Sequence, residues 1–300
     1  TEASRADLLT SEESRRGLAL SLVATVANSY ISLRDLDNQL LIARQTLKTR
    51  EESLRIFDLR YKGGVVSEME VAQVRSEMET ARISVTNLEL SVAQQENALS
   101  ALIGRLPGPI TRGKTLAEMG LPLPPVSLPS SILERRPDIR QAEQNLIANN
   151  ARIGVAKAAY FPTGPARVWS YGADLSMPIF NAGAIAGQVQ SAEARQVQAL
   201  EQYRKAIENA FREVDDALTG GNKTRETVDS RIRQVDALKT YARNASLRYE
   251  GGYSSFLEVL DAERSLFQAQ IYESQARGQA LIATTTLYKV LGGGWQAASE

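Results

Sequence analysis

The chain has 300 residues, and its 35 basic side chains balance its 35 acidic ones, so charge gives no reason to expect nucleic acid or an anionic membrane surface as a partner. Histidine and cysteine are both absent, which removes the commonest general base, the thiol nucleophile and the usual zinc ligands. We therefore expect no enzyme, no metal site and no cofactor. No stretch reaches the roughly 18 apolar residues that a membrane helix requires.

The first third of the chain carries a long helical pattern. Apolar residues recur at alternating spacings of four and three through residues 22–61, interrupted only by Ser29 and Arg50. This heptad pattern predicts a coiled-coil helix that ends at Gly63-Gly64. A second heptad run follows through residues 71–102. Because the joining loop is short, the two helices are expected to form an antiparallel hairpin.

The middle of the chain has a different composition. Residues 105–137 hold seven of the ten prolines, which predicts an irregular connector. Pro137-Asp138 is typical of a helix start, and the helix is expected to run to about Ala159. Residues 160–181 contain the other three prolines and a strand-like stretch at 168–171.

The last third again predicts two long helices. A heptad run through residues 200–249 weakens at Gly220-Gly221, where we expect a bend or a break. Gly251-Gly252 ends this run, and a final helix is predicted over residues 257–291. That helix carries a second stripe of small apolar residues, which indicates packing against two neighbouring helices.

The first and last thirds of the chain share a repeated sequence pattern. Arg60-Tyr61-Lys62-Gly63-Gly64 is echoed by Arg248-Tyr249-Glu250-Gly251-Gly252, and Glu70-Val71 recurs as Glu258-Val259 at the same offset along the chain. The sequence therefore predicts an all-α protein made of two related hairpins. We expect the first hairpin at 1–104, a connector with a short helix at 105–181, and the second hairpin at 182–300.

One segment matches a nucleotide-binding pattern. Residues 108–115 read Gly-Pro-Ile-Thr-Arg-Gly-Lys-Thr and fit the P-loop spacing. A P-loop follows a buried strand and opens a helix, whereas this segment follows a helix and precedes a short proline-rich stretch. We therefore do not expect nucleotide binding.

Four stretches resemble the TolC-like outer-membrane factor family, in its OprM-like branch. They span nearly the whole chain and are Leu133-Glu134-Arg135-Arg136-Pro137-Asp138-Ile139-Arg140-Gln141-Ala142-Glu143, residues 148–162, residues 178–183 and residues 287–295. The resemblance implies a homotrimer whose periplasmic part is a barrel of twelve helices, two hairpins from each chain. It also implies an outer-membrane β-barrel with four strands from each chain.

The chain departs from that pattern where the membrane strands are expected. Helical sequence is already under way at Thr1, which leaves no room for a strand hairpin before the first helix. The interval between Pro162 and Pro178 is too short for two membrane strands of about ten residues each and a loop. We therefore expect the β-barrel strands to be absent or trimmed. A relative that naturally lacks them is the alternative.

The resemblance also implies roles for two sets of residues. The glycine turns face a periplasmic adaptor protein in this family, which assigns adaptor contacts to Gly63, Gly64, Val65, Gly251, Gly252 and Tyr253. A constriction at the periplasmic end of the barrel corresponds to Leu257, Asp261 and Arg264. Without the resemblance, Asp261 and Arg264 could equally be an ordinary surface ion pair, since they lie three positions apart on one helix.

The function implied is that of a passive exit duct in the outer membrane of a Gram-negative bacterium, with this portion in the periplasm. Its partners would be the adaptor and an inner-membrane resistance–nodulation–division pump, with no nucleic acid involved. Two other kinds of protein remain as alternatives: a soluble coiled-coil scaffold and the periplasmic adaptor itself. A scaffold predicts polar loops in place of the proline-rich connector, and an adaptor predicts one hairpin with a β domain.

Overall fold

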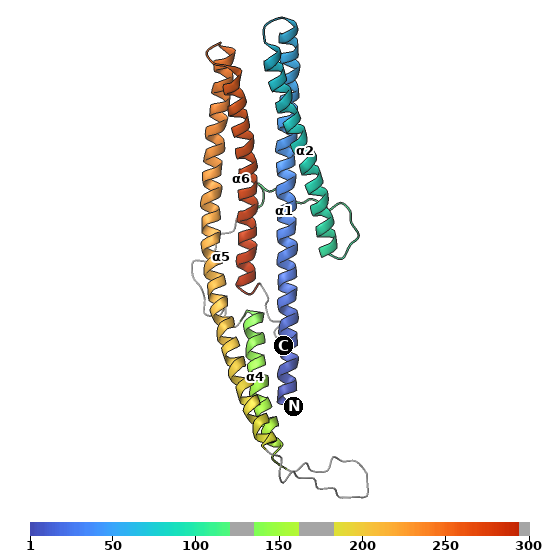
Figure 1. Cartoon of the computed structure of the whole chain (residues 1–300), viewed down its shortest axis with the longest axis vertical. Helices are drawn as coiled ribbons and strands as arrows, with labels where there is room; N and C mark the ends of the chain where they lie inside the picture. Colours follow the sequence, from blue (N-terminus) through green and yellow to red (C-terminus); the bar gives the residue numbers. More distant parts are fainter. Residues whose placement is uncertain (121–134, 162–182, 294–300) are drawn as a thin grey trace. The chain divides into compact units, whose positions relative to one another are not determined.

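In the computed structural model, residues 1–120, 135–161 and 183–293 are described, and within these ranges all regular structure is α-helical. The helices are α1 (Glu2–Lys62), α2 (Glu68–Leu102), α4 (Pro137–Ala158), α5 (Ala184–Glu250) and α6 (Phe256–Val290) (Figure 1). The predicted all-α class is confirmed. None of the helices in the described ranges combines the length and the apolar character that crossing a membrane requires. The strand-like stretch and the segment between Pro162 and Pro178 lie outside the described residues.

The chain divides into two compact units. One comprises the described parts of residues 1–21, 125–216 and 288–300, and the other comprises the described parts of residues 22–124 and 217–287. These units follow spatial proximity, whereas the division at residues 104 and 181 follows the sequence repeat. That repeat-based division into domains stays a prediction.

The helices of the two repeats end at equivalent positions of the sequence. α1 ends at Lys62 and α5 ends at Glu250, which are equivalent positions of the sequence repeat. Both bounds of α6 follow those of α2 by the same offset. The two hairpin turns fall at 63–67 and 251–255, where the sequence predicts them. In the second unit both turns lie at the same end (Figure 1).

The same hydrogen bonds close both turns. Gly64 N–H donates to the Tyr61 carbonyl (2.9 Å) and Val65 N–H to the Arg60 carbonyl (2.9 Å). At the equivalent positions of the second turn the same two bonds measure 3.0 and 2.8 Å. This is the Schellman pattern, which requires a left-handed residue just past the helix. Gly64 (φ 70°) and Gly252 (φ 73°) supply it, because residues with a Cβ rarely adopt such a φ.

An apolar cluster joins the two hairpins near their turns. Its rings are Phe57 on α1, Tyr249 on α5 and Phe256 on α6; the ring centroids of Phe57 and Phe256 lie 4.3 Å apart, and those of Tyr249 and Phe256 lie 5.2 Å apart. Both pairs are tilted, whereas Phe57 and Tyr249 are stacked; tilted and offset-stacked rings are the arrangements that aromatic pairs prefer. The rest of the buried cluster comprises Val71, Val74, Ala242, Ala245, Val259, Leu260 and Ala262.

The seams of the long helices are narrow and rich in alanine. Along α6 the buried stripe includes Ala262, Ala269, Ala276 and Ala280, as the second small-residue stripe predicts. The expected break at Gly220-Gly221 does not occur, since α5 is continuous from Ala184 to Glu250. Gly221 is buried in the seam, and the Thr224 hydroxyl donates to the carbonyls of Gly220 and Gly221 at 2.9 and 3.1 Å. Each glycine costs only about 1 kcal/mol of helix propensity, and the buried Val214 and Val228 on either side of the pair offset that cost.

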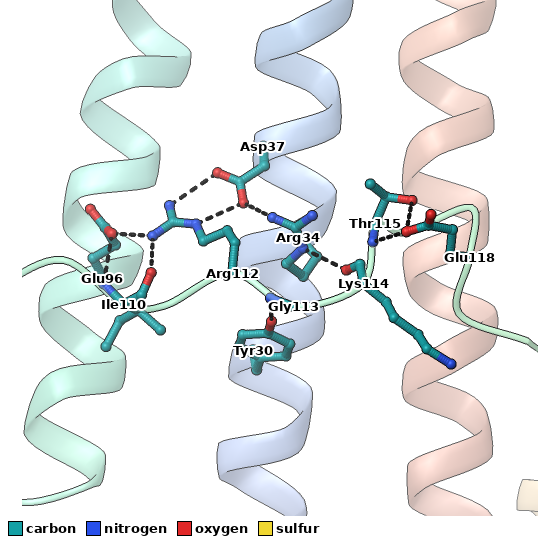
Figure 2. A network of polar contacts seen from close by, with 10 residues as sticks. All are labelled: Tyr30, Arg34, Asp37, Glu96, Ile110, Arg112, Gly113, Lys114, Thr115 and Glu118. Atoms are coloured by element: carbon teal, nitrogen blue, oxygen red, sulfur yellow. Dashed lines mark hydrogen bonds and ion pairs between the residues drawn. The ribbon is translucent and has the colours of Figure 1, made fainter.

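The segment 105–120, called the strap below, contains no helix or strand and crosses α1 from the α2 side to the α6 side (Figure 2). Leu116 is buried against Ile31 of α1 and Leu281 of α6. The P-loop pattern lies within the strap, and some of its amides have partners: Ile110 N–H donates to Glu96, and Gly113 N–H donates to the Tyr30 hydroxyl (2.8 Å). These amides are therefore engaged in holding the strap to α1 and α2.

Arg112 is the ionic centre of the strap (Figure 2). Its guanidinium forms two hydrogen bonds with Asp37 of α1, Nε to Oδ2 at 3.0 Å and Nη2 to Oδ1 at 3.1 Å, and it also binds Glu96 of α2. Arg34 binds the same Asp37 (2.6 Å) and donates to the Lys114 carbonyl (3.1 Å). The hydrogen bond from Arg112 lowers the pKa of Glu96. One planar fork thus joins α1, α2 and the strap.

In the first unit, Arg136 links several chain segments, as Arg112 does at the strap. It directly precedes α4 and is buried, and its guanidinium binds Asp138 (2.6 Å), Glu213 of α5 (2.7 Å) and the Val290 carbonyl at the end of α6 (3.1 Å). The sequence identifies this arginine only through the resemblance, and the structure gives it a physical role. It connects three helix segments in the first unit.

Replacing Arg112 with methionine is expected to lower the free energy of unfolding by about 2 kcal/mol, because two partly buried carboxylates each lose one charged hydrogen-bond donor. The measurement is chemical denaturation followed by circular dichroism. The matched control is Arg82→Met, whose ion pairs with Glu51 and Glu79 are about half exposed, and for which a loss under about 0.5 kcal/mol is expected.

The difference between wild type and Arg112→Met should also depend on pH. The folded pKa of Glu96 lies below its ordinary value of 4.5, so its contribution is present above that value and is lost as the pH falls through the lowered pKa. A difference that is the same at pH 7 and in strong acid would contradict the assignment.

Candidate functional site: the hairpin turns and the α2–α6 groove

The two turns present the residues that the sequence analysis assigns to partner binding. Gly63, Gly64 and Val65 are exposed at the first turn, as are Gly251, Gly252 and Tyr253 at the second. The helix after the first turn begins with a capping box in which Ser67 and Glu70 exchange hydrogen bonds. The first turn therefore has a fixed backbone on both sides.

Leu257, Asp261 and Arg264 lie just beyond the second turn, in the first turns of α6. Leu257 and Asp261 are exposed, Leu257 at 58%, and the Arg264 side chain is 61% exposed. They line one groove of about 330 Å³ between α2 and α6, together with Gln73, Ser76, Glu77 and Leu260. The spacing of four positions between Leu257 and Asp261 places both on one face, as predicted.

The partner of Arg264 is Glu77 of α2. Arg264 donates from Nε to Glu77 Oε1 at 2.7 Å and from Nη2 to the same oxygen. Within the described residues no ion pair joins Arg264 to Asp261, which is the pair that sequence spacing allowed. The hydrogen bond to Glu77 raises the pKa of Arg264. The interaction crosses from the first hairpin to the second, which an i, i+3 pair within one helix would not do.

Glu77 is buried and also binds α1. Arg50 approaches it with Nη1 at 3.0 Å from Glu77 Oε2 and 2.7 Å from the Glu77 carbonyl. Burial lowers the pKa of Arg50, and the charge of Glu77 opposes that shift. One carboxylate therefore holds side chains from α1 and α6 while sitting on α2. We call this set of Arg50, Glu77 and Arg264 the Glu77 junction.

Glu77 is not among the residues that the sequence pattern singles out, although the sequence holds a signal for it. Arg50 occupies an apolar heptad position of α1 and is buried. A buried arginine requires a carboxylate or carbonyl partner, because its charge cannot be removed by deprotonation. An acid close to the facing seam of α2 was therefore to be expected, and Glu77 lies between the buried Val74 and Met78.

A second groove, of about 380 Å³, is lined by α1, α5 and α6. Glu263 of α6 and Arg50 of α1 both contribute to it. Burial raises the pKa of Glu263, and the charge of Arg50 partly opposes that shift. Most of the residues that line it are polar or charged, but none of them is a nucleophile paired with a base.

The residues that line these two grooves are suited to protein contacts and ion pairs. No group of three or more histidine, cysteine, aspartate or glutamate side chains in the described residues is arranged to hold a metal ion. The residues can bind a protein surface, link helices or repel ions.

Comparison with known proteins gives one consistent picture. A sequence model of a family described as outer membrane efflux protein matches residues 1–105 and 163–293. The chain is 35% identical to the probable efflux pump outer membrane protein TtgC of Pseudomonas putida, over 98% of this chain and 65% of that protein. It is 33% identical to the cation efflux system protein CusC of Escherichia coli, over 99% of this chain and 69% of CusC.

Among solved structures, the open state of the MtrE outer membrane channel of Neisseria gonorrhoeae is similar. The TM-score is 0.84 and the identity 31%, covering 98% of this chain and 71% of that one. The chain thus spans slightly under two thirds of the length of TtgC and somewhat more of CusC and MtrE.

The contacts of the Glu77 junction predict how a substitution of Glu77 changes stability. Glu77→Gln should lower the free energy of unfolding by about 3 kcal/mol, because it removes the carboxylate that forms the ion pair with the buried Arg50. Glu79→Gln is the matched control: it makes the same chemical change two positions away on an exposed face and should cost under about 0.5 kcal/mol. Equal midpoints in urea for the two variants would exclude the junction as a stabilising element.

Proposed function

We propose that this chain, which belongs to the outer membrane efflux protein family, supplies the helical part of a passive exit duct in a tripartite efflux pump. The observation that carries the proposal is the pair of hairpins, whose helix ends and turn hydrogen bonds are related by one constant offset along the chain. Two equivalent hairpins per chain are the units from which a closed ring of helices can be assembled. The duct performs no chemistry and works in the outer membrane, with this portion in the periplasm.

The assembled state we propose is a homotrimer with twelve helices around its axis. Surface residues of α2 support a further helical neighbour: Ile83 and Leu90 are exposed and lie one heptad apart, so they share a face. Exposed apolar residues on one helix face indicate a protein contact. A second copy of the chain offers the helices to cover that face.

The turns are the proposed contacts for a periplasmic adaptor, through which the duct meets an inner-membrane resistance–nodulation–division pump. The adaptor-binding residues are Gly63, Gly64, Val65, Gly251, Gly252 and Tyr253. The exposure of both turns and their hydrogen-bonded backbone support this role, since a rigid surface loses little entropy on binding.

Leu257, Asp261 and Arg264 are the proposed gate. Around a threefold axis Leu257 would form an apolar ring and Asp261 a ring of carboxylates. The hydrogen bonds between Arg264 and Glu77 support the gate, because they hold the start of α6 against α2 and so oppose separation of the two hairpins. Opening by the adaptor would break this interaction in each subunit.

The double substitution Asp261→Ala with Arg264→Ala tests the gate in the full-length trimer. In the lost contact Arg264 is largely exposed, and the buried Glu77 keeps Arg50 as its partner, so about 0.5 kcal/mol per subunit is expected, and three subunits together shift the closed-to-open ratio by about tenfold. Single-channel recording in a planar bilayer should show higher conductance or more frequent opening. The control, Glu79→Gln, lies outside the groove and should conduct as wild type does; the same trace from the double variant would remove these residues from the gate.

Gly64→Trp combined with Gly252→Trp tests the turns. Both positions have open space where a side chain would begin, but both have a positive φ, so the tryptophans strain the turns and cover the docking surface. Efflux by cells carrying the full-length variant should fall to the level of cells without the duct, while helical content is retained. Efflux at the wild-type rate would refute adaptor docking at the turns.

A further inference from the structure

The second turn carries an aromatic ring packed against a glycine. Gly251 is not among the glycines with positive φ, so its backbone does not require glycine. A Cβ placed there would lie 2.9 Å from Tyr253 Cδ2 and 3.0 Å from Tyr253 Cε2. Such distances are too short for two carbon atoms, so any side chain at 251 would displace the ring. A Cβ there would also lie 3.3 Å from the Leu247 carbonyl oxygen, a milder crowding than that of the ring, so the ring is the main reason for glycine at 251.

The first turn lacks this arrangement although its hydrogen bonds are the same. A Cβ on Gly63, the counterpart of Gly251, would meet Val65 Cγ2 at 3.9 Å and the Arg60 carbonyl at 3.5 Å, which are ordinary contacts. Val65 stands where Tyr253 stands in the repeat. The two turns therefore share a backbone and differ in the side chain that they present.

The Tyr253 side chain is held on one side and open on the other. Tyr253 is 81% exposed even though its ring packs on Gly251, and its hydroxyl makes no hydrogen bond with the described residues. A tyrosine has only two side-chain torsions, so fixing one ring costs little entropy on binding. Rigid aromatic residues at the centre of a contact are the commonest binding hot spots.

The surroundings favour an apolar partner surface. Exposed apolar side chains accompany both turns, with Leu257 following Tyr253 and Met69 following Val65 along the chain. Arg248 and Glu258 approach each other to 3.7 Å and so partly cancel, which leaves the exposed Glu250 as the charge beside the turn. The second turn therefore offers a ring with one acidic side chain next to it.

We propose that Tyr253 is the principal anchor for the adaptor, and that Gly251 is a positioning residue that fixes its ring. This inference rests on the proposed function, in which the turns bind an adaptor. The occupant is the loop of a helical hairpin of the periplasmic adaptor, with an apolar recess that receives the free face of the ring. The two turns are then unequal, and the second determines which adaptor binds.

The test compares one added methyl group at the two equivalent glycines. The full-length trimer is captured on a sensor surface, and the purified periplasmic adaptor of the same efflux system is the analyte. Gly251→Ala should weaken binding at least about tenfold more than Gly63→Ala, because only the first displaces a ring. Tyr253→Ala should weaken binding at least about tenfold, and Tyr253→Phe should retain most of the affinity. Circular dichroism checks that each variant remains folded.

The double variant Gly251→Ala/Tyr253→Ala separates positioning from general damage to the turn. If Gly251 acts through the ring, the double variant binds no more weakly than Tyr253→Ala alone. Additive losses, or equal losses for Gly251→Ala and Gly63→Ala, would overturn the inference. The variant Gly64→Trp/Gly252→Trp distinguishes failure of the anchor from failure of the proposed function. If this variant does not bind the adaptor while Gly251→Ala binds as wild type does, only the role of Tyr253 as anchor is refuted. If this variant binds like wild type, docking of the adaptor at the turns is refuted as well.

Discussion

The narrowness of the helix seams is the constraint on which the arrangement of the second unit depends. A long helix with alanines along its seam lets its neighbours approach closely, but it buries little apolar area per turn. Such a seam also determines only weakly how far one helix is shifted along its neighbour, since one alanine resembles the next. The polar interactions supply that specification: the Glu77 junction near the turns and Arg112 at the strap each join helices at one defined height.

The two polar centres differ in exposure and so in what they can do. At the strap, the Arg112 guanidinium lies between two partly buried carboxylates, and Leu116 packs against α1 and α6. Both ionic and apolar contacts therefore hold the strap. In the Glu77 junction, Arg50 is buried while Arg264 is largely exposed. The Arg50 side of the junction is therefore costly to break, and the Arg264 side is not. In the proposed gate, the weakly held Arg264 is the side of the junction that would open and close.

Much of the fold is readable from the sequence because its signals are local. The heptad spacing and the paired glycines place both turns, and α2 and α6 begin and end at equivalent positions of the repeat. The break expected at Gly220-Gly221 fails because helix propensity is a local quantity worth only about 1 kcal/mol per glycine, whereas burial of the flanking Val214 and Val228 depends on tertiary packing. The strap was predicted only as irregular, since no periodicity reports that Arg112 reaches Asp37. For the candidate site, the sequence indicated Arg264 but not Glu77, because pairing between helices depends on register in three dimensions.

The strap also bears on the order in which the chain can fold. Its bonds to α1 join residues 75 to 83 positions apart, whereas the contact between Asp35 and Ser274 of α6 spans 239. A chain delivered from its amino terminus can therefore close the strap over α1 before any of α6 has emerged. Loop-closure entropy makes the longer contact about 1 kcal/mol costlier, which is small beside the delay in its synthesis. The first hairpin with its strap is thus equipped to act as the template on which the second hairpin docks.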